Sequence, residues 1–128
     1  MIILDENIAE NQRQLLRSWR ISVRCVGIEI GQVGIKDDAI IPLLHELRRP
    51  TFFTRDSDFY KANLRHAGYC LAYLAVDQYE AATFIRKVLR HHNLNTQAKR
   101  MGKIIRVSHD RLFVWQLRAE IETTLGWD

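Results

Sequence analysis

The stretch TFFTRDSDFY, residues 51–60, joins a short apolar run to two acidic residues. TFFT, residues 51–54, has the length and the β-branched and aromatic composition of a strand, and Pro50 ends any helix before it. Asp56 and Asp58 follow the run at once. Because carboxylates prefer water, the chain is predicted to leave the hydrophobic core here, at the end of a buried strand.

Similar apolar runs alternate with helical patterns along the rest of the chain. Besides 51–54, strands are predicted at 2–4, 21–25, 70–76 and 103–108. Helices are predicted at 8–19 with Asn7 as its cap, from Asp37 or Asp38 towards Pro50, and from 79 to 92. Pro42 fits the second helix at little cost only within the first turn, where backbone N–H groups have no helical partner.

The alternation of strands and helices predicts an α/β fold in three layers. Its sheet is expected to be mostly parallel, with helices on both faces. Residues 111–117 are interpreted as an antiparallel edge strand with a short helical tail, and a continuous helix over 111–125 is the competing interpretation. No repeat, low-complexity tract or linker interrupts the sequence, so residues 1–128 are predicted to form one domain.

Composition excludes several classes of protein. The chain has 47% hydrophobic and 27% charged residues, which is typical of globular proteins. No apolar run is long enough to span a membrane, and the first residues lack the pattern of a signal peptide. Cys25 and Cys70 lie in separate apolar stretches. They are interpreted as free buried thiols of a cytoplasmic protein, with one disulfide between them as the alternative.

The positive charge is unevenly distributed. The net charge is +4, which favours a polyanionic partner. Residues 86–106 contain seven Lys or Arg and no Asp or Glu. Contacts with a nucleic-acid backbone are predicted for Arg86, Lys87, Arg90, Lys99 and Arg100 of this stretch, and for Arg55 beside the acids, for which an ion pair is the alternative.

Three acidic sites that are distant in sequence are predicted to meet at one edge of the sheet. Asp5 follows the first strand, Asp56 and Asp58 follow the third, and Asp37 and Asp38 open the helix between them. Ligands of open α/β sheets bind outside the carboxyl ends of the strands, where the strand order reverses. Two carboxylates roughly 4 Å apart repel by about 4 kcal/mol at an effective dielectric near ~20, so the cluster favours a cation. Oxygen ligands suit Mg²⁺ or Mn²⁺, which can activate water for attack on a phosphodiester.

Three segments of the chain resemble the PIN-like nucleases, in particular a small bacterial group whose first strand reads LLDEN. They are ILDEN at 3–7, KDDAI at 36–40 and TRDSDF at 54–59, and their order and spacing also match. The resemblance implies a single three-layer PIN-like domain with a mostly parallel sheet and an antiparallel edge strand. It also implies a Mg²⁺- or Mn²⁺-dependent ribonuclease. The implied catalytic residues are Asp5, Asp37, Asp56 and Asp58, and these four and Asp38 are the implied metal ligands.

Many members of this family are the toxin of a VapB/VapC-type toxin–antitoxin pair. The resemblance therefore implies an RNA substrate, a small antitoxin protein as partner, and a homodimer. Larger PIN domains usually carry a Glu in the middle of a helix, where this chain has Asp37 at a helix start. This departure bears on the number of metal ions bound. Glu6 also matches a frequent family residue and is ranked below the other acids.

Each acidic pair also has an ordinary structural interpretation. Asp37 and Asp38 can be a cap and a first-turn acid, and Asp56 and Asp58 can be turn residues. A non-catalytic PIN-like module that binds RNA or protein is therefore the alternative function. A phosphoacceptor receiver domain is a third candidate. It is disfavoured because receivers need a Lys at the end of the last parallel strand, and KIIRVS, residues 103–108, has its Lys at the start.

Overall fold

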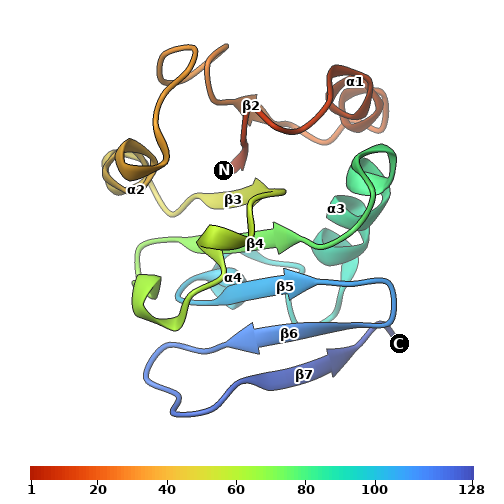
Figure 1. The fold of residues 1–128 in the computed structure, drawn as a ribbon. Coiled ribbons are helices and arrows are strands. Elements are labelled where there is room, and N and C mark those ends of the chain that lie inside the picture. Colours follow the sequence, from red (N-terminus) through yellow and green to blue (C-terminus); the bar gives the residue numbers. More distant parts are fainter.

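The computed structural model describes residues 1–128, and its seven strands form one sheet (Figure 1). The order across the sheet is β2-β1-β3-β4-β5-β6-β7. Neighbours among β1 to β5 are parallel, and β6 and β7 extend the sheet as antiparallel strands. The strands are β1 Ile2–Leu4, β2 Arg24–Cys25, β3 Thr51–Thr54, β4 Cys70–Leu74, β5 Ile104–Val107, β6 Arg111–Trp115 and β7 Thr123–Gly126.

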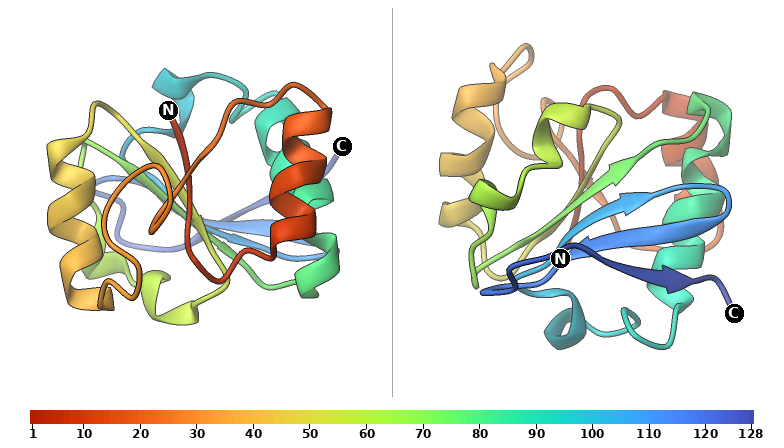
Figure 2. Two further views of the ribbon diagram at one scale, coloured as in Figure 1. Left: turned by 90° about the horizontal axis from the view of Figure 1, so that it is seen from above. Right: turned by 60° about the horizontal axis from the view of Figure 1, so that its bottom comes forward.

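Helices cover both faces of this sheet (Figure 2). One face carries α2 with the 3₁₀ helices η1 and η2, and the other carries α1 and α3. The helices are α1 Glu10–Ser18, α2 Asp37–Glu46, η1 Ser57–Phe59, η2 Ala62–Leu64, η3 Gln78–Glu80, α3 Ala81–Arg90 and α4 Gln97–Arg100. The predicted three-layer α/β architecture with a mostly parallel sheet is confirmed.

Successive residues of the central strands face opposite layers. Phe52 and Leu71 pack into the cluster beneath α2, whereas their neighbours Phe53 and Ala72 pack into the cluster beneath α1 and α3. All four side chains are fully buried. Strands that are covered on both faces read as continuous apolar runs, which is why these strands could be predicted from the sequence.

The strand order reverses at β1. Ile3 of β1 pairs with Arg24 of β2 on one side and with Phe52 of β3 on the other. The chain thus adds β2 on one side of β1, and then adds β3 and the later strands on the opposite side. Such a switch point leaves a crevice outside the carboxyl ends of the two strands. In this protein the crevice lies beyond the ends of β1 and β3.

The first helix starts later than predicted, and Asn7 does not cap it. Ala9 occupies the cap position of α1 and makes no side-chain capping bond. Asn7 instead donates its side-chain amide to the Thr54 hydroxyl at 3.3 Å and accepts the backbone N–H of Arg55 at 3.2 Å. The prediction of a helical cap was wrong because this amide ties the end of β1 to the end of β3. The predicted strand 21–25 is shorter than expected, because only its last two residues pair with β1.

Pro42 lies inside α2, beyond the first turn in which it was expected. Proline has no N–H group, so the carbonyl of Asp38 loses its helical partner four residues later. The side chain of Pro42 is exposed, and the buried contacts of α2 come from Ile40 and Leu44. Packing of these two residues against the sheet holds the helix together across the missing bond.

The C-terminal segment is a β-ribbon. β6 pairs antiparallel to β5 as predicted, so the interpretation of 111–125 as a continuous helix is wrong. The predicted helical tail is also wrong, because β7 pairs with β6 and takes the edge of the sheet. Arg118, in the connection between them, has a φ of 69° in the left-handed region, which reverses the chain and prevents a helix.

Both cysteines are buried and free, as predicted. Burial raises the pKa of the Cys70 thiol to about 12, so this side chain stays uncharged. Among the helices of the structure, none combines the length and the hydrophobicity needed to cross a membrane.

Candidate metal centre

Three carboxylates meet at the switch point of the sheet. One oxygen atom from each of Asp37, Asp56 and Asp58 lies within 4.8 Å of the other two. Asp37 is the first residue of α2, and the other two follow β3 directly. Because α2 leads into the start of β3, its own first residue lies at the edge where β3 ends. The predicted meeting of acids from separate segments is therefore present for these three residues.

Thr54 connects Asp5 to this acidic triad. Its hydroxyl donates to Asp5 Oδ2 at 2.7 Å and accepts the backbone N–H of Asp56 at 3.0 Å. It also accepts the side-chain amide of Asn7. Thr54 is fully buried as the last residue of β3. The Thr54 hydroxyl therefore bridges the Asp5 carboxylate and the backbone N–H of Asp56. Asp5 lies beside the triad but is not one of its three members.

Asp56 also shapes the backbone that carries Asp58. Its Oδ1 atom accepts the N–H of Asp58 at 2.9 Å and caps η1. This is the local turn bond that Asp side chains commonly form. The ordinary structural role of Asp56 is thus present, and the same bond fixes the spacing of the two carboxylates.

Two acids of this site, Asp5 and Asp37, have raised pKa values. Burial raises the pKa of Asp5, aided by the charge of Asp56 and opposed by the hydrogen bond from Thr54. The pKa of Asp37 is raised mainly by its hydrogen bond to the Asp56 carboxylate, which only a protonated Asp37 can donate. Burial and the neighbouring negative charges raise it further. Without a cation, the cluster thus relieves part of its repulsion by binding protons.

These raised pKa values predict how stability depends on pH without divalent ions. Above the unfolded pKa of 3.8, the folded chain holds more protons on Asp5 and Asp37 than the unfolded chain does. Their contribution to the free energy of unfolding is therefore lost as the pH rises through the raised values. We expect Asp37→Asn to melt at a higher temperature than the wild type at pH 7 in EDTA, and the difference to shrink towards pH 4. A difference that does not change with pH would contradict this account.

The triad can hold a small divalent ion once its side chains draw together. Mg²⁺ binds oxygen at about 2.1 Å, so two of its ligands are at most about 4.2 Å apart. Adjacent ligands of an octahedral ion lie only about 3.0 Å apart, so the three oxygens, within 4.8 Å of one another, would have to draw closer by up to about 2 Å to share one ion. An all-oxygen ligand set favours Mg²⁺ or Mn²⁺ over zinc or copper.

A hollow of about 300 Å³ adjoins the triad. Its lining residues are Asp37, Asp38, Ile41, Asp58, Phe59, Lys61, Asn63 and Leu64. Two members of the triad thus lie in its wall together with one cation, Lys61. Its volume is at the lower end for a small-ligand site. An anionic group held near the triad could be met by the ammonium group of Lys61.

Asp38 and Glu6 lie outside the triad. Asp38 contributes to the wall of the hollow, so its predicted role as a ligand is not supported by a position in the cluster. The carboxylate of Glu6 accepts the N–H of Gly34, with its two oxygens at 3.0 and 3.2 Å. Its side chain also lies 3.1 Å from where a Cβ on Gly27 would be, and Gly27 has a φ of 84°. Glu6 therefore fastens the loop before α2.

Arg100, which was predicted to contact RNA, is largely buried. Its side chain is only 6% exposed. The guanidinium donates to the Thr51 hydroxyl and to the Leu94 carbonyl, each at 2.9 Å. Burial lowers its pKa, and these bonds compensate its desolvation. Arg100 thus joins α4 to the start of β3, and these internal bonds do not support its predicted contact with RNA.

Arg55 and Lys99 have different surroundings. Arg55 forms no ion pair, since the two ion pairs of the chain are Arg17–Glu29 and His109–Glu80. Its Nε atom is buried without a hydrogen-bond partner. The ammonium of Lys99 is exposed and donates to the His92 carbonyl at 2.7 Å. Both remain candidates for RNA contact, whereas Arg86, Lys87 and Arg90 line a separate hollow on α3.

Sequence reasoning missed Thr54, Lys61 and Asn63 as parts of the site. Thr54 could have been found, because it is a polar residue at the end of the strand, two positions before Asp56. Lys61 and Asn63 follow the acids by a few residues, and only the fold of η1 and η2 turns them towards the same hollow.

Comparison of the chain with protein-family models, with curated proteins and with solved structures finds no match.

Proposed function

We propose that the protein is a metal-dependent endoribonuclease that binds Mg²⁺ or Mn²⁺ through Asp37, Asp56 and Asp58. The observation that carries this proposal is the meeting of three carboxylate oxygens within 4.8 Å at the carboxyl edge of the sheet. Such a cluster opposes folding unless protons or a cation neutralise it. The adjoining hollow with Lys61 gives room for a phosphate next to the ion.

When bound, the ion supplies an activated water and neutralises charge on the phosphate. The three triad carboxylates would hold it, and the turn bond from Asp58 N–H to Asp56 keeps two of them in register. Asp5 stands beside the triad with a raised pKa and a fixed orientation on Thr54. We assign Asp5 the role of general base, which takes a proton from the attacking water. Lys61 is assigned to hold the substrate phosphate.

The biological role follows from the resemblance of the three acidic segments to PIN-like toxins. The protein would then be the toxin component of a toxin–antitoxin pair. It would act on RNA in the cytoplasm and be kept inactive by a small antitoxin protein. A homodimer belongs to the same proposal.

Two other functions have some support. A non-catalytic binding module is compatible with the complete structural role of Asp56 in its turn. The strand order β2-β1-β3-β4-β5 is the doubly wound order that receiver domains also use. However, β5 ends at Val107 and is followed by Ser108, so no Lys ends the last parallel strand. Labelling of Asp56 by a small phosphodonor would favour the receiver.

Divalent ions test the proposal directly. Adding Mn²⁺ or Mg²⁺ to the EDTA-treated protein is expected to raise its melting temperature, because ligand at 100 times Kd stabilises by about 2.7 kcal/mol. Single-stranded RNA should be cut only when the ion is present. Stabilisation without cleavage would favour the binding module, and absence of both at millimolar ion would contradict a metal site altogether.

A further inference from the structure

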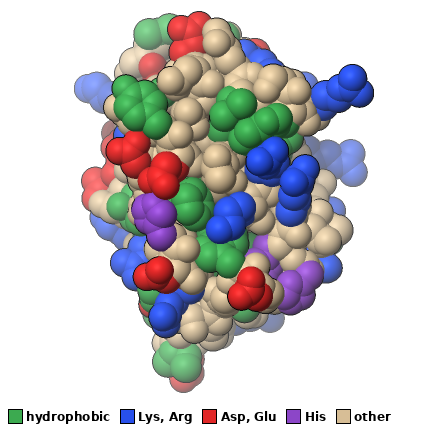
Figure 3. All heavy atoms as spheres, turned by 90° about the vertical axis from the view of Figure 1, so that its right-hand side faces the viewer, with side chains coloured by type: hydrophobic (Ala, Val, Ile, Leu, Met, Phe, Trp, Pro, Cys, Tyr) green, Lys and Arg blue, Asp and Glu red, His purple; other side chains and the backbone are tan.

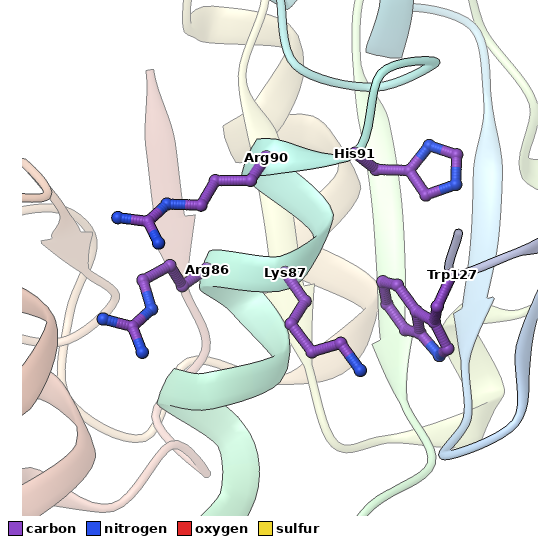
Figure 4. A pocket seen from close by; sticks show the side chains of 5 residues that line it. All are labelled: Arg86, Lys87, Arg90, His91 and Trp127. Atoms are coloured by element: carbon purple, nitrogen blue, oxygen red, sulfur yellow. The ribbon is translucent and has the colours of Figure 1, made fainter.

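A hollow of about 280 Å³ on α3 has three cations and no acid in its lining. Its lining residues are Arg86, Lys87, Arg90, His91 and Trp127 (Figure 4). Lys and Arg side chains gather beside hydrophobic ones on this face of the molecule (Figure 3). α3 covers the face of the sheet opposite α2, so the hollow is separate from the acidic triad. We propose that this basic hollow binds the phosphate backbone of a single RNA strand.

The cations of the basic hollow have no negatively charged partner. The two ion pairs of the chain, Arg17–Glu29 and His109–Glu80, involve none of them. Arg86 and Arg90 are one helical turn apart and extend side by side from α3 (Figure 4). Like charges at this spacing destabilise a helix. An anion bound between the two guanidinium groups would remove this repulsion.

Aromatic rings hold two of the cations in place without neutralising them. The guanidinium of Arg86 lies 3.6 Å from the centroid of the Trp19 ring. The ammonium of Lys87 lies 4.3 Å from the centroid of the Trp127 ring. The indole N–H of Trp127 donates to the Ser108 carbonyl at 3.0 Å, which fixes this ring. Cations that are already positioned lose less freedom when a ligand binds.

His91 contributes neither charge nor a metal ligand. Its Nε2 atom lies 2.7 Å from the Gly126 carbonyl, and its Nδ1 accepts the N–H of Asn93 at 3.1 Å. A carbonyl can only accept, so Nε2 donates to it, and Nδ1 serves as the acceptor for Asn93. Both ring nitrogens are used within the protein. The chemistry of the hollow is therefore that of an anion site.

Phosphate in a strand is the anion that fits this arrangement. Guanidinium groups bind phosphate with two parallel hydrogen bonds, which a pair of Arg side chains can offer from both sides. Lys87 points to the other side of the helix, towards Trp127, where it can meet a neighbouring phosphate (Figure 4). The half-buried indole gives a sugar or base an apolar surface. The choice of RNA as the source rests on the proposed function, whereas the preference for phosphate rests on the hollow alone.

Binding of labelled oligouridylate in EDTA tests the inference without any cleavage. By fluorescence anisotropy, Arg90→Gln is expected to weaken binding about tenfold, the loss typical of one charge-assisted hydrogen bond. It should also lower the dependence of log K on log salt by about 0.7. Arg48→Gln removes the same charge from an exposed position after α2, and is expected to change affinity by less than about twofold. Equal affinities of the two variants would overturn the proposal.

Competitors identify the source of the anion. Inorganic phosphate should displace the strand only at a large molar excess, and polyglutamate of equal length should displace it poorly. Equal competition by polyglutamate would overturn the assignment to phosphate, and tight binding of inorganic phosphate alone would overturn the assignment to a strand. The double variant Lys87→Gln, Arg90→Gln should bind more weakly still, with circular dichroism checking its fold. Binding that persists in a protein without nuclease activity would uphold this site and refute only the proposed function.

Discussion

Asp56→Asn is expected to abolish Mn²⁺-dependent RNA cleavage and to remove the metal-dependent rise in melting temperature. Asp56 supplies one of the three triad oxygens and raises the pKa of the neighbouring Asp37. Residues that only support a metal ligand cost about 10- to 100-fold in affinity or activity when replaced, so loss of a ligand should cost more than about a hundredfold. Initial cleavage rates and thermal melts with and without Mn²⁺ measure both effects.

The substitution should leave the fold intact. The Oδ1 atom of Asn can still accept the N–H of Asp58, which caps η1. Removing a charge from the triad should even raise the melting temperature in EDTA. Asp38→Asn is the matched control, since Asp38 lines the hollow without joining the triad. Similar losses in the two variants would show that general electrostatics, and not ion binding by the triad, governs activity.

Thr54→Val is expected to weaken metal binding and cleavage by about 10- to 100-fold, although Thr54 is no ligand. Valine has nearly the same shape but lacks the hydroxyl that contacts Asp5, Asn7 and the N–H of Asp56. Three polar groups at least partly shielded by the buried Thr54 would lose their partner, which should lower the free energy of unfolding by about 1–3 kcal/mol. Urea unfolding and metal titration measure the two losses separately.

The pH dependence of metal binding distinguishes a positioning role of Thr54 from a purely structural one. The hydroxyl bond lowers the pKa of Asp5, so its loss should move the acidic limb of the binding profile to higher pH. Thr54→Ser keeps the hydroxyl and should restore both the affinity and the profile. Unchanged metal affinity and an unchanged profile in Thr54→Val would contradict the positioning role.

The sheet and the two segments that supply the triad could be predicted because their patterns are local. TFFT and CLAYL are apolar runs that only a strand covered on both faces explains, and both are strands here. The place where the acids meet follows from chain order and from the rule for switch points. No side-chain detail was needed for either inference.

The errors concern residues whose partners are distant in sequence. The sequence pattern indicates a surface cation at Arg100. In the fold, however, α4 lies so that its guanidinium donates to Thr51, 49 residues away. Asn7 is a residue type that often caps helices, but here its side-chain amide is bonded to Thr54 and to the backbone N–H of Arg55. β7 contains a single large apolar residue, Leu125, and becomes a strand only because β6 offers it an edge. Such competition is decided by tertiary contacts, which sequence patterns do not contain.

The way Asp37 is carried has a consequence for ion selectivity. Asp56 and Asp58 are fixed to the end of a buried strand, whereas Asp37 follows a loop tied down by the Glu6 carboxylate, and no residue from Gly27 to Ala39 is fully buried. Segments with few buried contacts deform at low cost. A coordination sphere in which Asp56 and Asp58 are fixed and Asp37 can shift is able to adapt to ions of different radius. Discrimination between Mg²⁺ and Mn²⁺ would then depend on how far this loop can follow the ion, more than on the identity of the donor atoms.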